Sequence, residues 1–307
     1  MTYNFDEIVD RSQNYAAKFE ESVLHYGTND VIPLWIADMD FRTAPCIVEA
    51  IKQRADQGIF GYTWRTPKYF EAIAAWQKKR NGWRPEIEKM AFAPGVVPGM
   101  RMILTMFTQP GGKVLIQQPV YHPFADVVHN TGRELVVSPL KRDENGYYTM
   151  DYADFEEKAK DAKYFILCNP HNPVGRVWTP EELKTVGDIC VRHGVEIISD
   201  EIHSDLMLDG HKHTCMASVS PEIAAITTTC IAPSKTFNLA GLQSLKKRTA
   251  RHFQQSPCET SMAYSIRPCS KRFLSAIFVS TPQMPASRRK QSKRKLLRWM
   301  KFRFRSS

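Results

Sequence analysis

Lys235 is the residue whose type and setting first suggest chemistry. It lies in residues 232–242, a stretch made almost entirely of small and apolar residues. An amine in such surroundings is partly shielded from water, and desolvation disfavours its charged form. A neutral lysine amine can attack a carbonyl and form a Schiff base with an aldehyde cofactor. Because most lysines are simply solvated, this feature alone leaves an ordinary surface role open.

Asn172 lies in a polar turn that follows a predicted buried strand. The apolar run Tyr164–Cys168 leads into Asn169-Pro170-His171-Asn172-Pro173. A continuous apolar run predicts a strand buried on both faces, and the residue before each proline is biased away from helix. Ligands of open α/β sheets bind beyond the carboxyl ends of the strands, where we expect Asn172. A plain loop after a strand is the alternative.

Asp200 ends a second apolar run, residues 195–199. The same two readings apply to it, a ligand-binding strand end or a polar loop. Asp200 follows Asn172 by 28 residues and precedes Lys235 by 35 residues.

Alternating helix and strand patterns must position these side chains. Helices are predicted over residues 45–57, 67–81, 96–108, 121–130, 151–160 and 180–193, and strands over 113–117, 134–139, from 164 and up to 200. The last helix has the clearest boundaries, because Thr179 can cap it, Pro180 suits its first turn and Gly194 can end it. Strands that alternate with helices predict an α/β fold with a mostly parallel sheet.

Four motifs carry a resemblance to a known family: residues 32–41 (Ile-Pro-Leu-Trp-Ile-Ala-Asp-Met-Asp-Phe), 119–124 (Pro-Val-Tyr-His-Pro-Phe), 169–176 (Asn-Pro-His-Asn-Pro-Val-Gly-Arg) and 199–205 (Ser-Asp-Glu-Ile-His-Ser-Asp). With the order of Asn172, Asp200 and Lys235, they resemble the fold-type-I pyridoxal-phosphate enzymes of aminotransferase class I and II. Within these, the chain is most similar to the carbon–sulfur lyase branch, the cystathionine β-lyases. The similarity runs from about Tyr3 to Gln243 and implies a PLP-dependent transferase-like, three-layer α/β/α fold.

The resemblance implies a role for four side chains around the cofactor, pyridoxal 5'-phosphate. Lys235 corresponds to the lysine that holds the cofactor and then acts as the base at the substrate Cα. Asp200 corresponds to the carboxylate that keeps the pyridine nitrogen protonated. Asn172 corresponds to the donor to the phenolic oxygen. Tyr121 corresponds to the aromatic residue that stacks on the ring, with a core tyrosine at a strand end as the alternative.

The cofactor phosphate is expected at the start of the helix predicted from residue 96. A Gly-containing turn that leads into a helix offers free N–H groups to an anion, and the resemblance implies the amides of Val96 and Val97. Ser234 is a further phosphate ligand by the same resemblance, and Tyr62 corresponds to a tyrosine that reaches the phosphate of the neighbouring subunit. An ordinary loop–helix junction and an interface aromatic are the alternatives.

His203 and Gln243 occupy positions where the sequence departs from many aminotransferases. His203 stands three residues after Asp200, where those enzymes carry a tyrosine, so a bond to the phenolic oxygen and a loop-capping role both stay open. Gln243 replaces a phosphate-binding arginine, which favours a lyase over a transaminase.

The sequence changes character near residue 244. Residues 245–307 are rich in Lys and Arg and contain one acidic residue, Glu259, so the formal net charge of +10 comes from this segment. We hypothesise a frameshifted or disordered tail, after an N-terminal segment (1–44) and an incomplete cofactor-binding large domain (45–244). The small C-terminal domain of the family is then expected to be missing, and with it the arginine that binds the substrate carboxylate.

The expected function is a carbon–sulfur β-lyase that releases a thiol, pyruvate and ammonia from a cystathionine-like sulfur amino acid, impaired by the altered C-terminal segment. An aminotransferase and an inactive or regulator-interacting protein are the alternatives. The resemblance suggests a homodimer. The sequence shows no leader and no membrane-spanning stretch, so we expect a cytoplasmic protein without membrane or nucleic-acid partners. No metal site is expected, although His211, His213 and Cys215 lie close together.

Overall fold

The structure is a computed structural model that describes residues 4–11 and 14–242. Its contacts divide these residues into two compact units. Residues 65–232 form the sheet unit, and residues 4–11 and 14–64 together with 233–242 form the N-terminal unit. Gln243 and the basic segment 245–307 lie outside the described residues.

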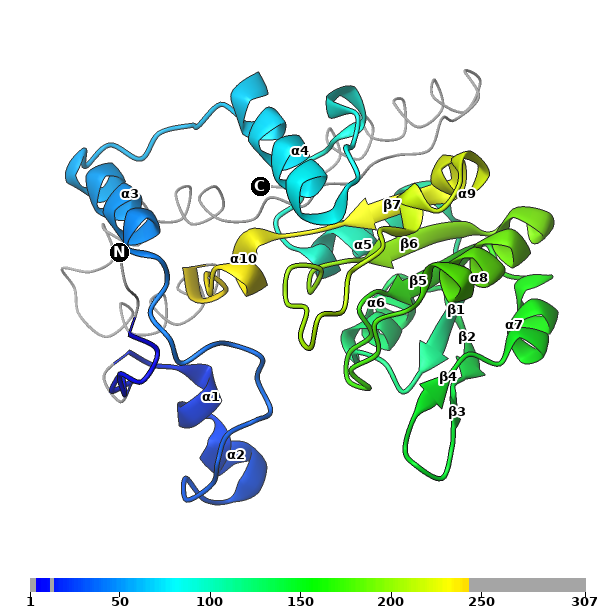
Figure 1. Cartoon of the computed structure of the whole chain (residues 1–307), viewed down its shortest axis with the longest axis horizontal. Coiled ribbons are helices and arrows are strands. Elements are labelled where there is room, and N and C mark those ends of the chain that lie inside the picture. Colours follow the sequence, from blue (N-terminus) through cyan, green and yellow to red (C-terminus); the bar gives the residue numbers. More distant parts are fainter. Residues whose placement is uncertain (1–3, 12–13, 243–307) are drawn as a thin grey trace. The chain divides into compact units, whose positions relative to one another are not determined.

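A five-stranded parallel sheet is the framework of the sheet unit (Figure 1). Its strands follow the order β2-β1-β5-β6-β7, and every pairing is parallel. Their bounds are β1 Lys113–Gln118, β2 Glu134–Pro139, β5 Tyr164–Cys168, β6 Glu196–Asp200 and β7 Thr227–Cys230. A separate antiparallel pair joins β3 (Lys141–Arg142) to β4 (Tyr148–Thr149). The predicted mostly parallel sheet is therefore confirmed.

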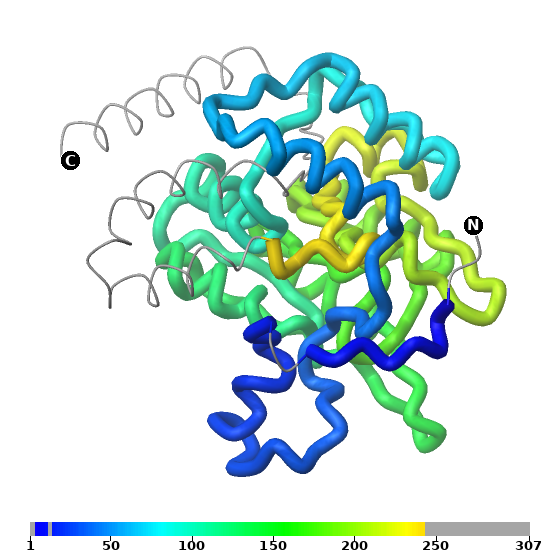
Figure 2. Tube along the Cα trace, turned by 90° about the vertical axis from the view of Figure 1, so that its left-hand side faces the viewer, coloured from blue at the N-terminus to red at the C-terminus, as the bar shows by residue number. Residues whose placement is uncertain are grey.

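Helices cover both faces of this sheet, as the two apolar cores show (Figure 2). The helices of the sheet unit are α4 Pro67–Asn81, α5 Val96–Phe107, α6 Pro123–Asn130, α7 Tyr152–Ala159, α8 Pro180–His193 and α9 Pro221–Ile226, with short 3-10 turns η1 Ile87–Lys89 and η2 Met216–Ser218. Side chains of α5 and α6 pack on one face with Ile116 and Ile198, whereas those of α7 and α8 pack on the other with Phe165 and Ile197. Because successive strand residues point to opposite faces, this gives three layers, α/β/α.

The boundaries of α8 follow the local signals in the sequence. The Thr179 side chain accepts a hydrogen bond from the Glu182 amide, and the Glu182 carboxylate accepts one from the Thr179 amide, which makes a capping box. Pro180 occupies the first turn, and Gly194 ends the helix in the left-handed region at φ 65°. Such local signals allow the bounds to be predicted without knowledge of the packing.

The described residues of the N-terminal unit form four helices, three near the start of the chain and one almost 200 residues later. They are α1 Ala17–Glu20, α2 Ser22–Tyr26, α3 Pro45–Asp56 and α10 Pro233–Thr236. Extended chain between α2 and α3 contacts the residues after α10 through hydrogen bonds such as Thr43 Oγ1 to the Phe237 carbonyl, 2.7 Å. This unit therefore holds the segment that carries Lys235.

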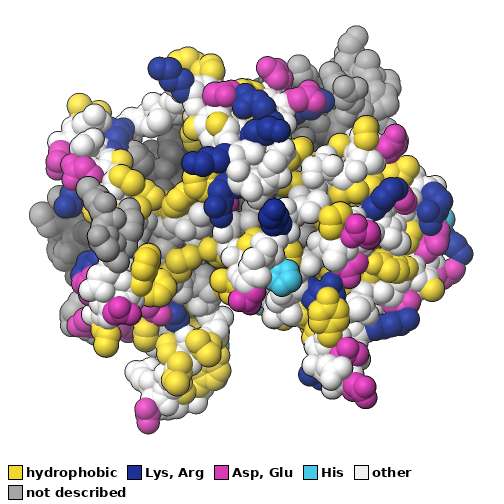
Figure 3. All heavy atoms as spheres, in the orientation of Figure 1, with side chains coloured by type: hydrophobic (Ala, Val, Ile, Leu, Met, Phe, Trp, Pro, Cys, Tyr) yellow, Lys and Arg dark blue, Asp and Glu magenta, His cyan; other side chains and the backbone are white. Residues whose placement is uncertain are grey.

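The surface differs between the two units. Basic and acidic side chains intermingle over α7 and α8 (Figure 3), where Lys184 pairs with Asp188 and Arg192 with Glu156. Apolar side chains gather over α1 and α2, and Leu24 is 80% exposed. Among the described residues, no helix has the length and apolar character needed to cross a bilayer.

Candidate active site

Asp200 lies at the carboxyl end of β6, between two buried thiols. The strand register pairs it with Cys168 of β5 on one side and Cys230 of β7 on the other. All three residues are buried, and Asp200 is 4% exposed. Residues that share a register position in a parallel sheet point to the same face, so the carboxylate and both thiols face one layer. Burial and the charge of Asp200 raise the pKa of the Cys168 and Cys230 thiols, which keeps them protonated.

Tyr121 lies beside this cluster, in the loop between β1 and α6. Its ring makes an edge-on contact with Phe124, with centroids 5.9 Å apart. Burial raises the pKa of the Tyr121 hydroxyl, and the charge of Asp200 raises it further. An electrostatic effect of this kind requires proximity, so the structure brings Tyr121 and Asp200 to the same end of the sheet.

The turn that carries Asn172 is held by its own backbone and by Cys168. The Asn172 amide donates to the Cys168 sulfur at 3.3 Å, and the thiol donates to the Pro170 carbonyl at 3.4 Å. The His171 amide donates to the Arg176 carbonyl at 2.8 Å, and the His171 Nε2 lies 2.9 Å from the Pro119 carbonyl oxygen. Pro119 belongs to the loop that leads to Tyr121. Asn172 therefore sits on a turn that is tied to both the thiol next to Asp200 and the Tyr121 loop.

The N-terminus of α5 offers its first amides to an anion. Gly95 is the N-cap, and no side chain caps the helix by a hydrogen bond. The first N–H groups of a helix have no partner within the helix, and the positive end of its dipole lies there. The amides of Val96 and Val97 therefore stand where a phosphate would be favoured.

His203 follows β6 in a turn of the sheet unit, where its carbonyl accepts from the Leu206 amide at 2.9 Å. This contact involves the backbone and not the ring, so both predicted roles of the His203 side chain stay predictions.

Lys235, Ser234 and Tyr62 belong to the N-terminal unit. Lys235 lies on α10, and its Nζ donates to the Ala37 carbonyl at 2.7 Å. Ser234 is buried, and Tyr62 is 89% exposed. Each unit therefore contains some of the predicted site residues. That Lys235 lies near Asp200 and Asn172 stays a prediction.

A buried polar network next to Asp200 was not anticipated from the sequence. The Glu201 carboxylate accepts from the Ser199 hydroxyl at 2.9 Å and from the Met216 amide at 3.0 Å. His213 Nε2 lies 2.9 Å from its other oxygen. Glu201 follows Asp200 directly, so the alternation of strand side chains turns it to the opposite side. That alternation was the one signal available in the sequence.

The same part of the sheet unit contains His213 and Cys215, two of the residues considered for a metal site from the sequence. Among the described residues, Glu201, His213 and Cys215 form a group whose possible ligand atoms lie within 4.8 Å of one another. His211 is exposed and does not belong to this group. Burial and the charge of Glu201 raise the pKa of the Cys215 thiol. A metal ligand must be a thiolate, so an ion bound here would have to displace that proton.

Comparisons with known proteins identify relatives of this chain. The family model described as aminotransferase class I and II matches residues 29–244. The chain is 47% identical over 243 residues to the cystathionine β-lyase PatB of Bacillus subtilis, covering 78% of this chain and 62% of PatB. It is 32% identical to the protein MalY of Escherichia coli, covering 78% of this chain and 61% of MalY. It thus spans less than two thirds of the length of these two relatives.

Two solved structures with bound or contained cofactor share the fold. A PLP-bound chain from Clostridium difficile 630 matches with a TM-score of 0.81 and 46% identity, covering 97% of this chain and 68% of that one. Cystalysin from Treponema denticola, which contains pyridoxal 5'-phosphate, matches with a TM-score of 0.75 and 33% identity, covering 89% of this chain and 73% of cystalysin. The expected PLP-dependent transferase-like architecture is confirmed by these likenesses.

Proposed function

Because the chain belongs to the aminotransferase class I and II family, we propose that it binds pyridoxal phosphate and cleaves the carbon–sulfur bond of a cystathionine-like amino acid. One observation of the molecule carries this proposal: a buried carboxylate, Asp200, at the strand ends with the Tyr121 ring beside it. The likeness to PatB supports the lyase reaction in particular.

The residues of the sheet unit fit this cofactor in their chemistry. Asp200 would hold a proton on the pyridine nitrogen, and Tyr121 would stack on the ring. Asn172 would donate to the phenolic oxygen. The uncapped start of α5 would bind the phosphate through the amides of Val96 and Val97. In the N-terminal unit, Lys235 would hold the cofactor covalently, and Ser234 would add a phosphate contact.

When bound, pyridoxal phosphate supplies a carbonyl for the substrate amine and a ring that accepts electrons. Lys235 then serves as the base that removes the proton from the substrate Cα. Asp200 keeps the ring nitrogen protonated, which favours this proton transfer. The proposed β-lyase reaction would break the Cβ–S bond and release the thiol, and water would convert the remaining three-carbon unit to pyruvate and ammonia.

We also propose that two copies of the chain associate through the N-terminal unit. Leu24, Ile32 and Leu34 of this unit are at least 80% exposed, which is unusual for large apolar side chains unless a partner covers them. Tyr62 would then reach the phosphate of the partner copy. A reducing cytoplasm is the expected location, in agreement with five free thiols among the described residues.

Pyruvate release tests the proposed reaction. The full chain with pyridoxal phosphate and L-cystathionine should release pyruvate, and Lys235→Ala should lower the rate by at least about hundredfold, because positioned acid–base catalysis contributes that much. Lys52→Ala, which removes an exposed lysine of α3 in the same unit, should leave the rate unchanged. Amino transfer to a keto acid without pyruvate would contradict the lyase and identify an aminotransferase.

A further inference from the structure

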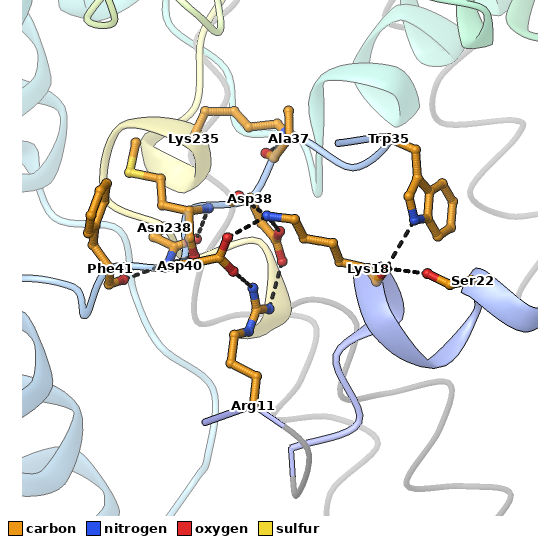
Figure 4. A network of polar contacts seen from close by, with 11 residues as sticks. Arg11, Lys18, Ser22, Trp35, Ala37, Asp38, Asp40, Phe41, Lys235 and Asn238 are labelled. Carbon is orange, nitrogen blue, oxygen red and sulfur yellow. Dashed lines mark hydrogen bonds and ion pairs between the residues drawn. The ribbon is translucent and has the colours of Figure 1, made fainter. Parts of the chain in front are cut away.

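Hydrogen bonds join residues 37–43 to residues 235–238, the segment that carries Lys235 (Figure 4). Lys235 Nζ donates to the Ala37 carbonyl, and Thr43 donates to the Phe237 carbonyl, each at 2.7 Å. Between these two contacts, Asn238 bonds to the backbone of Met39. All of these contacts lie within the N-terminal unit, although they join residues almost 200 positions apart.

Asn238 makes three hydrogen bonds to this segment with one side chain. Its Oδ1 accepts from the Met39 amide at 3.1 Å, and its Nδ2 donates to the carbonyls of Met39 at 2.8 Å and Phe41 at 3.1 Å. Only an amide side chain of this length combines one acceptor with two donors in this way. Asn238 also adopts φ 53°, a left-handed conformation that asparagine tolerates better than most residues. Two independent requirements thus select asparagine here.

Ion pairs hold the other side of the same segment. Arg11 binds Asp38 at 2.8 Å and Asp40 at 2.6 Å, and Lys18 binds Asp40 at 2.7 Å. The side chain of Lys18 is 7% exposed, whereas that of Asp40 is 51% exposed, so only the lysine of this pair is removed from water. Lys18 also donates to the Asp38 carbonyl at 3.2 Å. The segment is therefore fixed from both sides, with Asn238 on the side of Lys235.

We propose that the Ala37 carbonyl is the docking acceptor for the Lys235 amine, and that Asn238 is the positioning residue that holds this carbonyl in place. This inference rests on the proposed function for the role of Lys235 as a base. A neutral amine that donates one N–H to a carbonyl keeps its lone pair for a proton. Docking on Ala37 therefore leaves the amine oriented and able to act at the substrate Cα.

Competitive labelling of lysines with a limiting amount of acetic anhydride tests this in the full chain without cofactor. The hydrogen bond to the Ala37 carbonyl holds the Lys235 amine in place and restricts its encounter with the reagent. Asn238→Gly removes the three hydrogen bonds of the side-chain amide, and glycine readily adopts the left-handed conformation of this position. We expect Lys235 in this variant to be labelled about fivefold faster relative to Lys52, the size expected for one net hydrogen bond. An unchanged ratio would overturn the proposal.

Thr43→Val is the matched control, because it removes a different bond of the same segment. It should change the labelling ratio of Lys235 by less than about twofold, since the bonds of Asn238 remain. An increase as large as that of Asn238→Gly would refute the specific role of Asn238.

A measurement on the unchanged chain guards against a variant that does not fold. Residue-resolved amide exchange should show that the Met39 N–H exchanges slowly, because it is bound to Asn238 Oδ1. Fast exchange at Met39 would overturn the proposal without any substitution. Neither measurement uses pyridoxal phosphate or substrate. A chain that docks Lys235 but releases no pyruvate would therefore refute the proposed reaction and leave the docking inference supported.

Discussion

Acid should destabilise the turn that carries Asn172, because His171 is buried in its neutral form. The ring of His171 is 2% exposed and packs edge-on against Trp178, with centroids 5.3 Å apart. Burial lowers the pKa of His171 to about 4, although the hydrogen bond to the Pro119 carbonyl opposes this shift and the charge of Arg176 adds to it.

The sign and size of the effect follow from this pKa. The unfolded chain, with an ordinary histidine pKa near 6.5, binds the proton more readily than the folded chain does. The stability that His171 contributes is therefore complete above about pH 6.5 and is lost as the pH falls toward 4, the folded value. At pH 5 the loss is about 2 kcal/mol of unfolding free energy.

Urea unfolding at pH 7 and pH 5 measures this loss in the full chain. His171→Gln cannot titrate, so its free energy of unfolding should fall by about 2 kcal/mol less than that of the unchanged chain between the two pH values. His211→Gln, which replaces an exposed histidine, should behave like the unchanged chain. Equal losses for the unchanged chain and His171→Gln would refute the assignment of the acid sensitivity to His171.

Three further outcomes are expected. Glu201→Ala should lower the free energy of unfolding by roughly 3 kcal/mol or more, because it leaves buried donors without an acceptor; a loss below about 1 kcal/mol in a urea titration would contradict this. Gly187→Ala should cost about 1–3 kcal/mol in thermal unfolding, since the new Cβ would lie 2.5 Å from Ile223 Cδ1 and 2.9 Å from Met216 Cε. Tyr121→Ala should weaken pyridoxal phosphate binding about threefold to tenfold in an absorbance titration, whereas Tyr121→Phe should bind nearly as before; equal weakening by both would rule out ring stacking.

Elements with strong local signals could be predicted from the sequence. The bounds of α4, α8 and β2 agree with the predicted ranges. Helix α5 ends one residue earlier than predicted, and α7 is one residue shorter at each end. Proline in the first turn of α4 and α8 and glycine after their last residues explain this agreement. The predicted helix from Tyr121 begins instead at Pro123, where the ring suits the first turn.

Elements without such signals were missed. Strand β7 consists of three threonines and Cys230, all buried, so it shows neither an apolar run nor an alternation. The helices α1 and α2 contain only four and five residues, too few for a helical period. Their stability comes from tertiary contacts such as the Trp35 indole donating to the Lys18 carbonyl at 3.0 Å.

The candidate site shows the same division between local and distant information. Asp200 and Asn172 could be placed at strand ends because the apolar runs before them were clear. The hydrogen bonds of the Glu201–His213 pair and of the Asn238 side chain join residues that only the folded structure brings together. No sequence pattern predicts these partners. The roles of all the site residues stay predictions: Lys235, Asp200, Asn172, Tyr121, Val96, Val97, Ser234, Tyr62 and His203. The boundaries proposed at residues 44 and 244 stay predictions as well.

The covalent bond between Lys235 and the cofactor is the most direct test of the proposed chemistry. The full chain would be incubated with pyridoxal phosphate, reduced with borohydride and digested, and the modified lysine would be located by mass spectrometry. We expect the pyridoxyl group on Lys235, with Lys52 and the other exposed lysines unmodified at stoichiometric cofactor. A pyridoxyl group spread over surface lysines, or none on Lys235, would contradict the proposal that this chain forms a pyridoxal-phosphate site.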